Sequence, residues 1–285
     1  MPVKIVTDST CDLPSSIIDT FNISVVPLFV NIEGKSYRDG VTITREAFYR
    51  QLPTWQSFPQ TAAPGPEHFR QVYRQLLDDG ASAVLSLHIS ESLSLTVNSA
   101  RKAAEQMNDP RVIVMDSRQL SLGMGFLVQS AAELAAAGAS IDEIVAAVEE
   151  KNMRTHVVAA IDTLKFLRKS GRMNGVVAGL GSILKIKPIL KMFDGNPTSE
   201  RVRTRRRAFA RLENLLAAAA PLERVALVHT HAPQAAAELK SKIAPLLPSG
   251  DIWSMDITPV LGAHLGPGAV GLAYVSAQNA RSEEL

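Results

Sequence analysis

The chain has 285 residues, of which 46% are hydrophobic and 20% are charged, and its formal net charge is +2. This composition is typical of a globular protein and excludes an intrinsically disordered chain. The small net charge argues against a nucleic-acid partner, and the single cysteine, Cys11, excludes an intrachain disulfide and a cysteine-based zinc site. No apolar run is long enough to span a bilayer, so we expect a cytoplasmic protein with no stable membrane insertion.

The first half of the chain alternates strand and helix patterns, which indicates an α/β domain with a mainly parallel sheet. The predicted strands cover residues 3–6, 25–30, 83–87 and 112–115, and the predicted helices cover 15–21, 44–52, 67–77, 97–107, 126–137 and 141–151. Asp8-Ser9 follows the first of these strands and Asp116-Ser117 follows the last. Because ligands bind beside the carboxyl ends of strands in such sheets, we expect a polar edge there.

Two aspartates near this edge have structural interpretations. Asp8 has no second carboxylate two positions on, so we interpret it as a turn residue that supports its neighbours rather than as a metal or phosphoryl-transfer site. Asp12, with Pro14, predicts the cap and first turn of the helix at 15–21.

Hydroxyl side chains gather directly after the strand at 83–87, at Ser90, Ser92, Ser94 and Thr96. A strand, a hydroxyl-rich turn and a helix start can bind an anion, because the first N–H groups of a helix have no internal partner. The same residue types also cap helices for purely structural reasons, and this stretch alone favours that interpretation.

A loop stiffened by three prolines is predicted at 58–66 and carries Thr61. Each proline fixes its own φ and restricts the residue before it, so the loop is preorganised. It either holds a ligand group through Thr61 or serves as a plain connector to the next helix.

A domain boundary is predicted between residues 152 and 153, which divides the chain into an N-terminal α/β domain (1–152) and a C-terminal α/β domain (153–285). The second half contains predicted strands at 155–160, 186–192, 224–230, 251–257 and 270–276, and predicted helices at 164–169, 174–184, up to 219 and at 233–246. A turn is predicted at 194–197 and a turn-rich loop at 259–268.

Familiar catalytic motifs do not explain this chain. The G-x-G-x-x-G match at 266–271 precedes a strand rather than a helix, and the sequence has no Walker A motif and no G-x-S-x-G. The arginine-rich run at 201–207 lacks aromatic neighbours for base stacking, which favours a solvated helix start or an anion-facing patch.

A set of hydroxyl, cationic and imidazole side chains remains. It consists of Thr61, Ser94, Arg172, Arg203 and His264. Such a set can bind one carboxylate while apolar helices enclose an aliphatic tail, and no nucleophile–base pair is evident.

Ordered sequence blocks along the whole chain resemble the DegV family of bacterial fatty-acid-binding proteins. In the first half these blocks are TDSTCDLP at 7–14, YRDG at 37–40, TAAPGP at 61–66, LHIS at 87–90, LSLT at 93–96 and DS at 116–117. In the second half they are TLKFL at 163–167, GR at 171–172, LGSILKIKPIL at 180–190 and HLGPGA at 264–269.

The resemblance implies a two-domain DegV-like fold that holds one long-chain fatty acid, for example a C16 or C18 acid, in a tunnel between the domains. By the family pattern, Thr61 and Ser94 bind the carboxylate, and Arg172, Arg203 and His264 lie near the head group or at a docking surface. The implied partner is a separate fatty acid kinase that makes an acyl phosphate for phospholipid metabolism. The chain would then be a carrier rather than an enzyme, with no cofactor and no metal.

The sequence departs from the family pattern at two positions and leaves two other hypotheses open. Leu95 stands where the family usually has glycine, which predicts a narrower head-group site or a changed backbone angle. Ala62 stands where a second serine is common. The alternatives are a hydrolase or transferase acting on acyl or phosphoryl groups with Ser94 and His264, and a nucleic-acid regulator using 201–207.

Overall fold

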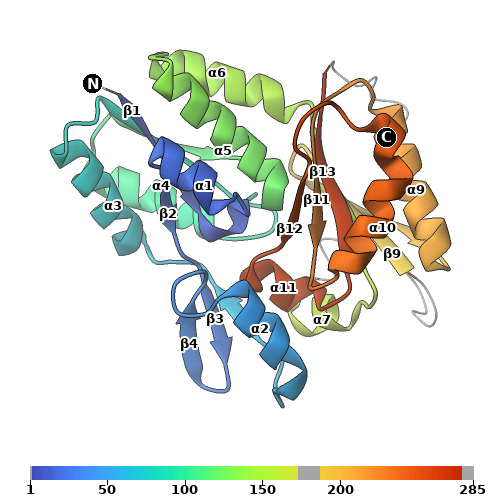
Figure 1. The fold of residues 1–285 in the computed structure, drawn as a ribbon. Coiled ribbons are helices and arrows are strands. Elements are labelled where there is room, and N and C mark those ends of the chain that lie inside the picture. The colour runs from blue at the N-terminus through green and yellow to red at the C-terminus, as the bar shows by residue number, and fades with distance from the viewer. Residues whose placement is uncertain (1, 173–186, 278–285) are drawn as a thin grey trace.

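Three sheets organise the fold in the computed structural model, which describes residues 2–172 and 187–277 (Figure 1). The first half forms a four-stranded and a three-stranded sheet, and the second half forms a six-stranded sheet. The helix predicted at 174–184 lies outside the described residues. Within the described residues, no helix has the length and apolar character that crossing a bilayer requires.

The four-stranded sheet is parallel throughout, in the order β2-β1-β6-β7, and helices cover both of its faces. Its strands are β1 (Val3–Asp8), β2 (Ser24–Val26), β6 (Ala83–His88) and β7 (Val112–Asp116). Apart from two short helices beside the small sheet, the helices of this half are η1 (Ser9–Cys11), α1 (Ser15–Phe21), α3 (Pro66–Asp78), α4 (Thr96–Met107), α5 (Ser121–Ala136) and α6 (Ile141–Asn152). Val84 packs with α3 and α4 on one face, and Leu85 packs with α5 on the other. The prediction of a strand buried on both faces at 83–87 is confirmed.

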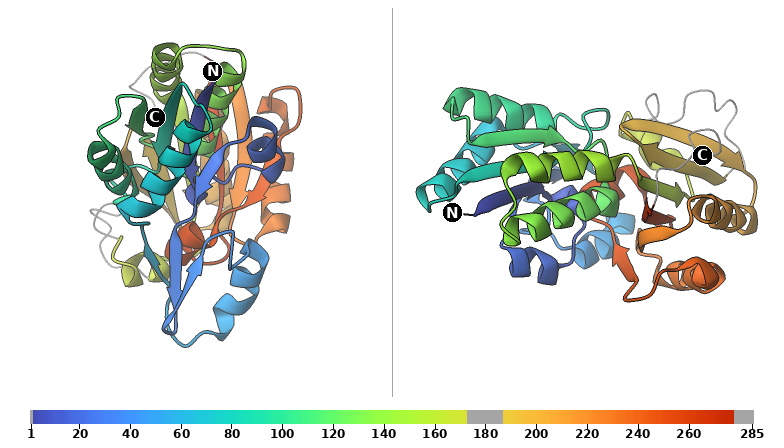
Figure 2. Two further views of the ribbon diagram at one scale, coloured as in Figure 1. Left: turned by 90° about the vertical axis from the view of Figure 1, so that its left-hand side faces the viewer. Right: turned by 90° about the horizontal axis from the view of Figure 1, so that it is seen from above.

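The six-stranded sheet has the order β10-β9-β8-β13-β11-β12, and every neighbouring pair is antiparallel except β11 with β12. Its strands are β8 (Thr155–Ala160), β9 (Lys187–Phe193), β10 (Asn196–Val202), β11 (Leu222–His229), β12 (Trp253–Asp256) and β13 (Val270–Ser276). The helices of this half are α7 (Lys165–Lys169), α9 (Arg205–Ala218), α10 (Pro233–Ile243), η3 (Ala244–Leu246) and α11 (Pro259–Leu265). Helices α9 and α10 cover one face, and the other face packs against α5 (Figures 1 and 2).

Helix α5 lies between the two larger sheets, and two glycines let it pack closely on β8 and on η1. A Cβ on Gly123 would lie 2.5 Å from Val157 Cγ2 in β8, and a Cβ on Gly125 would lie 2.5 Å from the Cys11 carbonyl oxygen. The helix begins at Ser121 rather than at the predicted residue 126, so both glycines lie inside it.

The small antiparallel sheet comprises β3 (Phe29–Ile32), β4 (Lys35–Arg38) and β5 (Gln60–Ala62), and α2 (Arg45–Gln51) and η2 (Leu52–Thr54) lie beside it. The single strand predicted at 25–30 is wrong, because Pro27 falls in the break between β2 and β3. The proline-stiffened loop at 58–66 contains β5, which places Thr61 on a strand.

One predicted loop of the second half is a helix, and one strand of this half was not predicted. The loop predicted at 259–268 is largely α11, which has Pro259 in its first turn and Thr258 as its cap, a usual helix start. The turn predicted at 194–197 is confirmed at residues 194–195, but β10, which follows it and pairs with β9 as a hairpin, was not predicted. In contrast, the strand at 270–276 has its predicted bounds.

Candidate functional site

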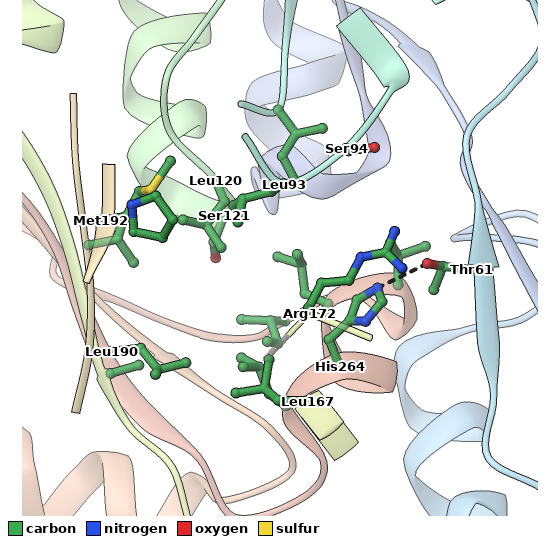
Figure 3. Close-up of a pocket in the computed structure, with 18 of the residues that line it drawn as sticks. Thr61, Leu93, Ser94, Leu120, Ser121, Leu167, Arg172, Leu190, Met192 and His264 are labelled. Atoms are coloured by element: carbon green, nitrogen blue, oxygen red, sulfur yellow. Dashed lines mark hydrogen bonds between the residues drawn. The ribbon is translucent and has the colours of Figure 1, made fainter. Parts of the chain in front are cut away.

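A pocket of about 350 Å³ lies beside α5, with walls from both halves of the chain (Figure 3). Most of the wall is apolar, and it includes Leu28, Ile89, Leu93, Leu120, Val157, Leu167, Leu190, Met192, Val228, Ile257, Val260, Leu261 and Leu265. The polar side chains on the wall are Thr61, Ser94, Ser121, Lys191, Arg172 and His264. A mainly apolar cavity with a few polar groups is typical of a site for a small, largely apolar molecule.

A hydroxyl–imidazole pair faces this pocket. Thr61 lies in β5, where it pairs with Val30 of β3, and His264 lies at the end of α11. Thr61 Oγ1 and His264 Nε2 are 2.9 Å apart, although the two residues are 203 positions apart in the sequence (Figure 3). The fold therefore brings together two residues that the sequence analysis singled out separately.

The imidazole of His264 is neutral at neutral pH. Burial and, to a smaller extent, the nearby Arg172 guanidinium lower the pKa of His264 to about 4. Nδ1 of the ring is buried and has no hydrogen-bond partner among the described residues. A neutral ring that donates Nε2–H to Thr61 leaves the threonine hydroxyl proton free for an acceptor in the pocket.

Of the other three predicted site residues, two line the pocket and one does not. Ser94 and Arg172 line the pocket, and Figure 3 shows Thr61, Ser94, Arg172 and His264 toward one end of it and Leu190 and Met192 toward the other. Arg203 is exposed and is not among the lining residues. The structure therefore separates Arg203 from the surroundings of the other four, and its suggested docking role stays a prediction.

The two departures from the family pattern both lie on the pocket wall. Leu95 has φ −80° and ψ 8°, a conformation that needs no glycine, and its side chain is 70% exposed. The narrower head-group site and the changed backbone angle expected at this position stay predictions. Ala62 is the exposed last residue of β5 and pairs with Phe29.

Ser94 is not paired with His264. Its Oγ lies 2.8 Å from Thr96 Oγ1 and accepts from the Thr96 backbone N–H at 3.3 Å. Ser94 thus stabilises the turn before α4, whose cap position is Leu95, while the same side chain still reaches the pocket. Nothing in this geometry activates Ser94 as a nucleophile toward an acyl or phosphoryl group.

Asp8 and Asp12 are both fully buried, but only Asp8 has its predicted role. Asp8 accepts hydrogen bonds from the Thr10 backbone N–H and the Ile89 backbone N–H, each at 3.0 Å, as expected of a residue that supports its neighbours. Asp12 does not cap α1; it accepts from the Ser121 hydroxyl at 2.6 Å and from the Thr258 backbone N–H at 2.8 Å.

Ser121 is a polar pocket residue that the sequence analysis missed. It begins α5 with φ +51°, and its hydroxyl is bound to Asp12. Among the described residues, no group of three or more His, Cys, Asp or Glu side chains is placed to hold a metal ion.

Comparisons with known proteins agree with one another. The DegV family model matches residues 2–277. A DegV domain-containing protein of Deinococcus radiodurans is 37% identical over 277 residues, which cover 96% of this chain and 98% of that protein. A structure described as fatty acid binding of a DegV family protein from Thermus thermophilus is 35% identical, with a TM-score of 0.89, and the match covers 97% of this chain and 100% of that one. The structure of DegV, a fatty acid binding protein from Bacillus subtilis, is 29% identical, with a TM-score of 0.88 and coverage of 97% and 99%.

Proposed function

This chain belongs to the DegV family, and from that premise we propose that it binds one long-chain fatty acid, such as a C16 or C18 acid, in the pocket beside α5. The observation that carries the proposal is the pocket's composition: an apolar wall with hydroxyl, imidazole and guanidinium groups toward one end. The fatty acid binding described for the Thermus thermophilus and Bacillus subtilis relatives supports it.

The carboxylate is proposed to lie at the end formed by Thr61, Ser94, Arg172 and His264. Thr61 donates its hydroxyl proton to the carboxylate while it accepts Nε2–H from His264, and Ser94 does the same with Thr96 as its donor. Arg172 supplies the positive charge that a carboxylate removed from water requires.

The acyl tail is proposed to run along the apolar wall toward Leu190 and Met192. Each methylene removed from water contributes about 0.8 kcal/mol, so the tail supplies most of the affinity and the polar end sets the orientation. In this complex the acid lies between the proposed domains, residues 1–152 and 153–285, and the lining residues on both sides of residue 152 support that arrangement.

The bound acid is proposed to be presented to a separate fatty acid kinase, which forms the acyl phosphate. The chain is then a carrier rather than the catalyst and needs no cofactor. Exposed Arg203, which lies outside the pocket lining, suits a docking role better than a head-group role. We expect Arg203→Ala to slow acyl phosphate formation in a coupled kinase assay without changing palmitate affinity.

Lipid extraction tests the binding function directly. Protein purified without added lipid is expected to release a C16 or C18 fatty acid on solvent extraction, detected by mass spectrometry. After lipid removal, it is expected to bind palmitate saturably and to bind hexadecylamine, which has the same tail and a positive head group, much more weakly. No extracted acid together with no saturable palmitate binding would refute the proposal.

A further inference from the structure

A buried hydrogen-bond cluster joins the first half of the chain to the start of α11. We call it the Thr258 cluster, and it consists of Ser9, Asp12, Asp39, Ser121 and Thr258. Asp12 accepts from the Thr258 backbone N–H at 2.8 Å and from the Ser121 hydroxyl at 2.6 Å. Asp39 accepts from the Thr258 hydroxyl, and from the Ser9 hydroxyl at 2.7 Å. Two carboxylates from separate segments therefore hold the backbone and the side chain of one residue.

Thr258 controls where α11 begins, because it is the cap of that helix. His264 follows six positions later, which is about 9 Å along a helix axis. The helix is also held along its length, since Tyr49 Oη donates to the Ile257 carbonyl at 3.1 Å and Gly262 packs directly on the Tyr49 ring. A short helix fixed at its start and its middle carries His264 to a defined position beside Thr61.

We propose that Thr258, Asp39 and Asp12 are positioning residues for the carboxylate site: they fix α11 so that His264 meets Thr61. This inference rests on the proposed fatty-acid binding. The three residues do not line the pocket themselves, but their neighbours Ile257 and Ser121 do. They therefore act on a ligand only through the elements they hold.

The electrostatic cost of the cluster supports a role beyond simple packing. Burial raises the pKa of Asp12 to about 6 and that of Asp39 to about 7, despite the hydrogen bonds that favour their charged forms. Arg45 Nη2, 3.1 Å from Asp12 Oδ1, offsets part of the cost. One oxygen of Asp39 is buried without a partner among the described residues. Apolar side chains would fill such a space at lower cost, and buried polar groups that persist are typical of places where geometry has to be specified.

Two ligands with the same tail separate positioning from general stability. Palmitate carries the carboxylate, and hexadecan-1-ol carries only the chain and a hydroxyl. Thr258→Val removes the hydroxyl at constant shape and is expected to weaken palmitate binding about tenfold while hexadecanol affinity stays within about twofold. Thr258→Ser keeps the hydroxyl and is expected to preserve both affinities.

The outcomes distinguish this proposal from the function on which it rests. An equal loss of affinity for both ligands, or no loss for either, would overturn the positioning role, because only the carboxylate of palmitate is expected to depend on the position of His264. Wild-type protein that binds neither ligand would overturn fatty-acid binding itself. If circular dichroism shows that Thr258→Val is unfolded, Asp39→Asn replaces it, because asparagine has the size of aspartate. The expected result is the same: weaker palmitate binding and unchanged hexadecanol binding.

Discussion

Two histidines form hydrogen bonds with hydroxyl groups in this protein, and their surroundings differ. His88 Nε2 lies 2.7 Å from Ser86 Oγ and its Nδ1 lies 3.0 Å from Asp8 Oδ2, so both ring nitrogens are used and the ring is fully buried in the core. His264 uses Nε2 toward Thr61, has no partner for Nδ1 among the described residues, and lines the pocket. A satisfied network inside the core stabilises the fold, whereas a partly satisfied pair beside a cavity is available to a ligand.

Judged by residue types alone, His88 would be the catalytic histidine and His264 a structural one. Asp8, His88 and Ser86 follow the order of a Ser-His-Asp relay, yet Tyr73 Oη donates to Ser86 Oγ at 2.8 Å and all four side chains are buried. A substrate has no access to that serine. The pocket, conversely, pairs its histidine with a threonine and leaves Ser94 bound to Thr96. The hydrolase or transferase hypothesis therefore gains no support from either histidine.

The largest expected effect comes from breaking the satisfied network. Asp8→Ala removes the acceptor of His88 Nδ1 and of the Thr10 and Ile89 backbone N–H groups. We expect the free energy of unfolding to fall by about 3–5 kcal/mol, measured by urea denaturation, because buried donors lose their partner. Exposed Asp251 provides the matched control, and Asp251→Ala is expected to change the free energy of unfolding by less than about 0.5 kcal/mol. A similar small change in Asp8→Ala would contradict the structural role of the network.

Acid should destabilise the protein through His264. Burial lowers the pKa of His264 to about 4, whereas the unfolded chain has the ordinary value near 6.5. Between these values the unfolded state binds the proton and the native state does not, so this contribution is fully present above pH 6.5 and is lost as the pH falls toward 4. Between pH 6.5 and 4 we expect the free energy of unfolding to fall by about 2 kcal/mol less in His264→Gln than in wild type, measured by urea denaturation at each pH.

His156 offers a control for that experiment. Burial also lowers its pKa to about 4, but it lies in β8 and does not line the pocket. His156→Gln is expected to reduce the acid loss in the same direction and to leave palmitate affinity unchanged. If only one of the two substitutions alters the pH dependence, the other histidine is not held neutral by burial as the structure indicates.

The pocket pair should show a smaller effect on ligand binding than the core network shows on stability. Thr61→Val keeps the side-chain shape and removes the hydroxyl that faces His264 and the proposed carboxylate. We expect palmitate affinity to fall about tenfold, or about 1.4 kcal/mol, in a calorimetric titration. Thr61→Ser retains the hydroxyl and should bind nearly as wild type does. Unchanged binding by Thr61→Val would place the carboxylate elsewhere.

Local signals in the sequence predicted much of the fold. The buried run at 83–87 and the strand at 270–276 depend on residues that are adjacent in the chain. The start of α11 had local signals as well, in Thr258 and Pro259, but the glycines that follow favoured a loop and outweighed them.

Contacts between distant segments could not be predicted in the same way. The sequence indicated Thr61 and His264 by residue type, but their contact depends on how β5 and α11 pack together. The bonds of Asp12 to Ser121 and Thr258 span 109 and 246 positions, and no local pattern encodes them. Asp12 instead matched a helix-cap pattern that the fold does not use.

The smallest effect is expected at Leu95, where the family usually has glycine. The residue has φ −80°, a backbone conformation that does not favour glycine, and it is 70% exposed at the pocket wall. We expect Leu95→Gly to change palmitate affinity by less than about twofold, because an exposed side chain at the rim adds little apolar burial to a bound acid. A tenfold gain would instead mean that Leu95 obstructs the proposed carboxylate. The polar end of the pocket would then be limited by access as well as by the hydrogen bonds of Thr61 and His264.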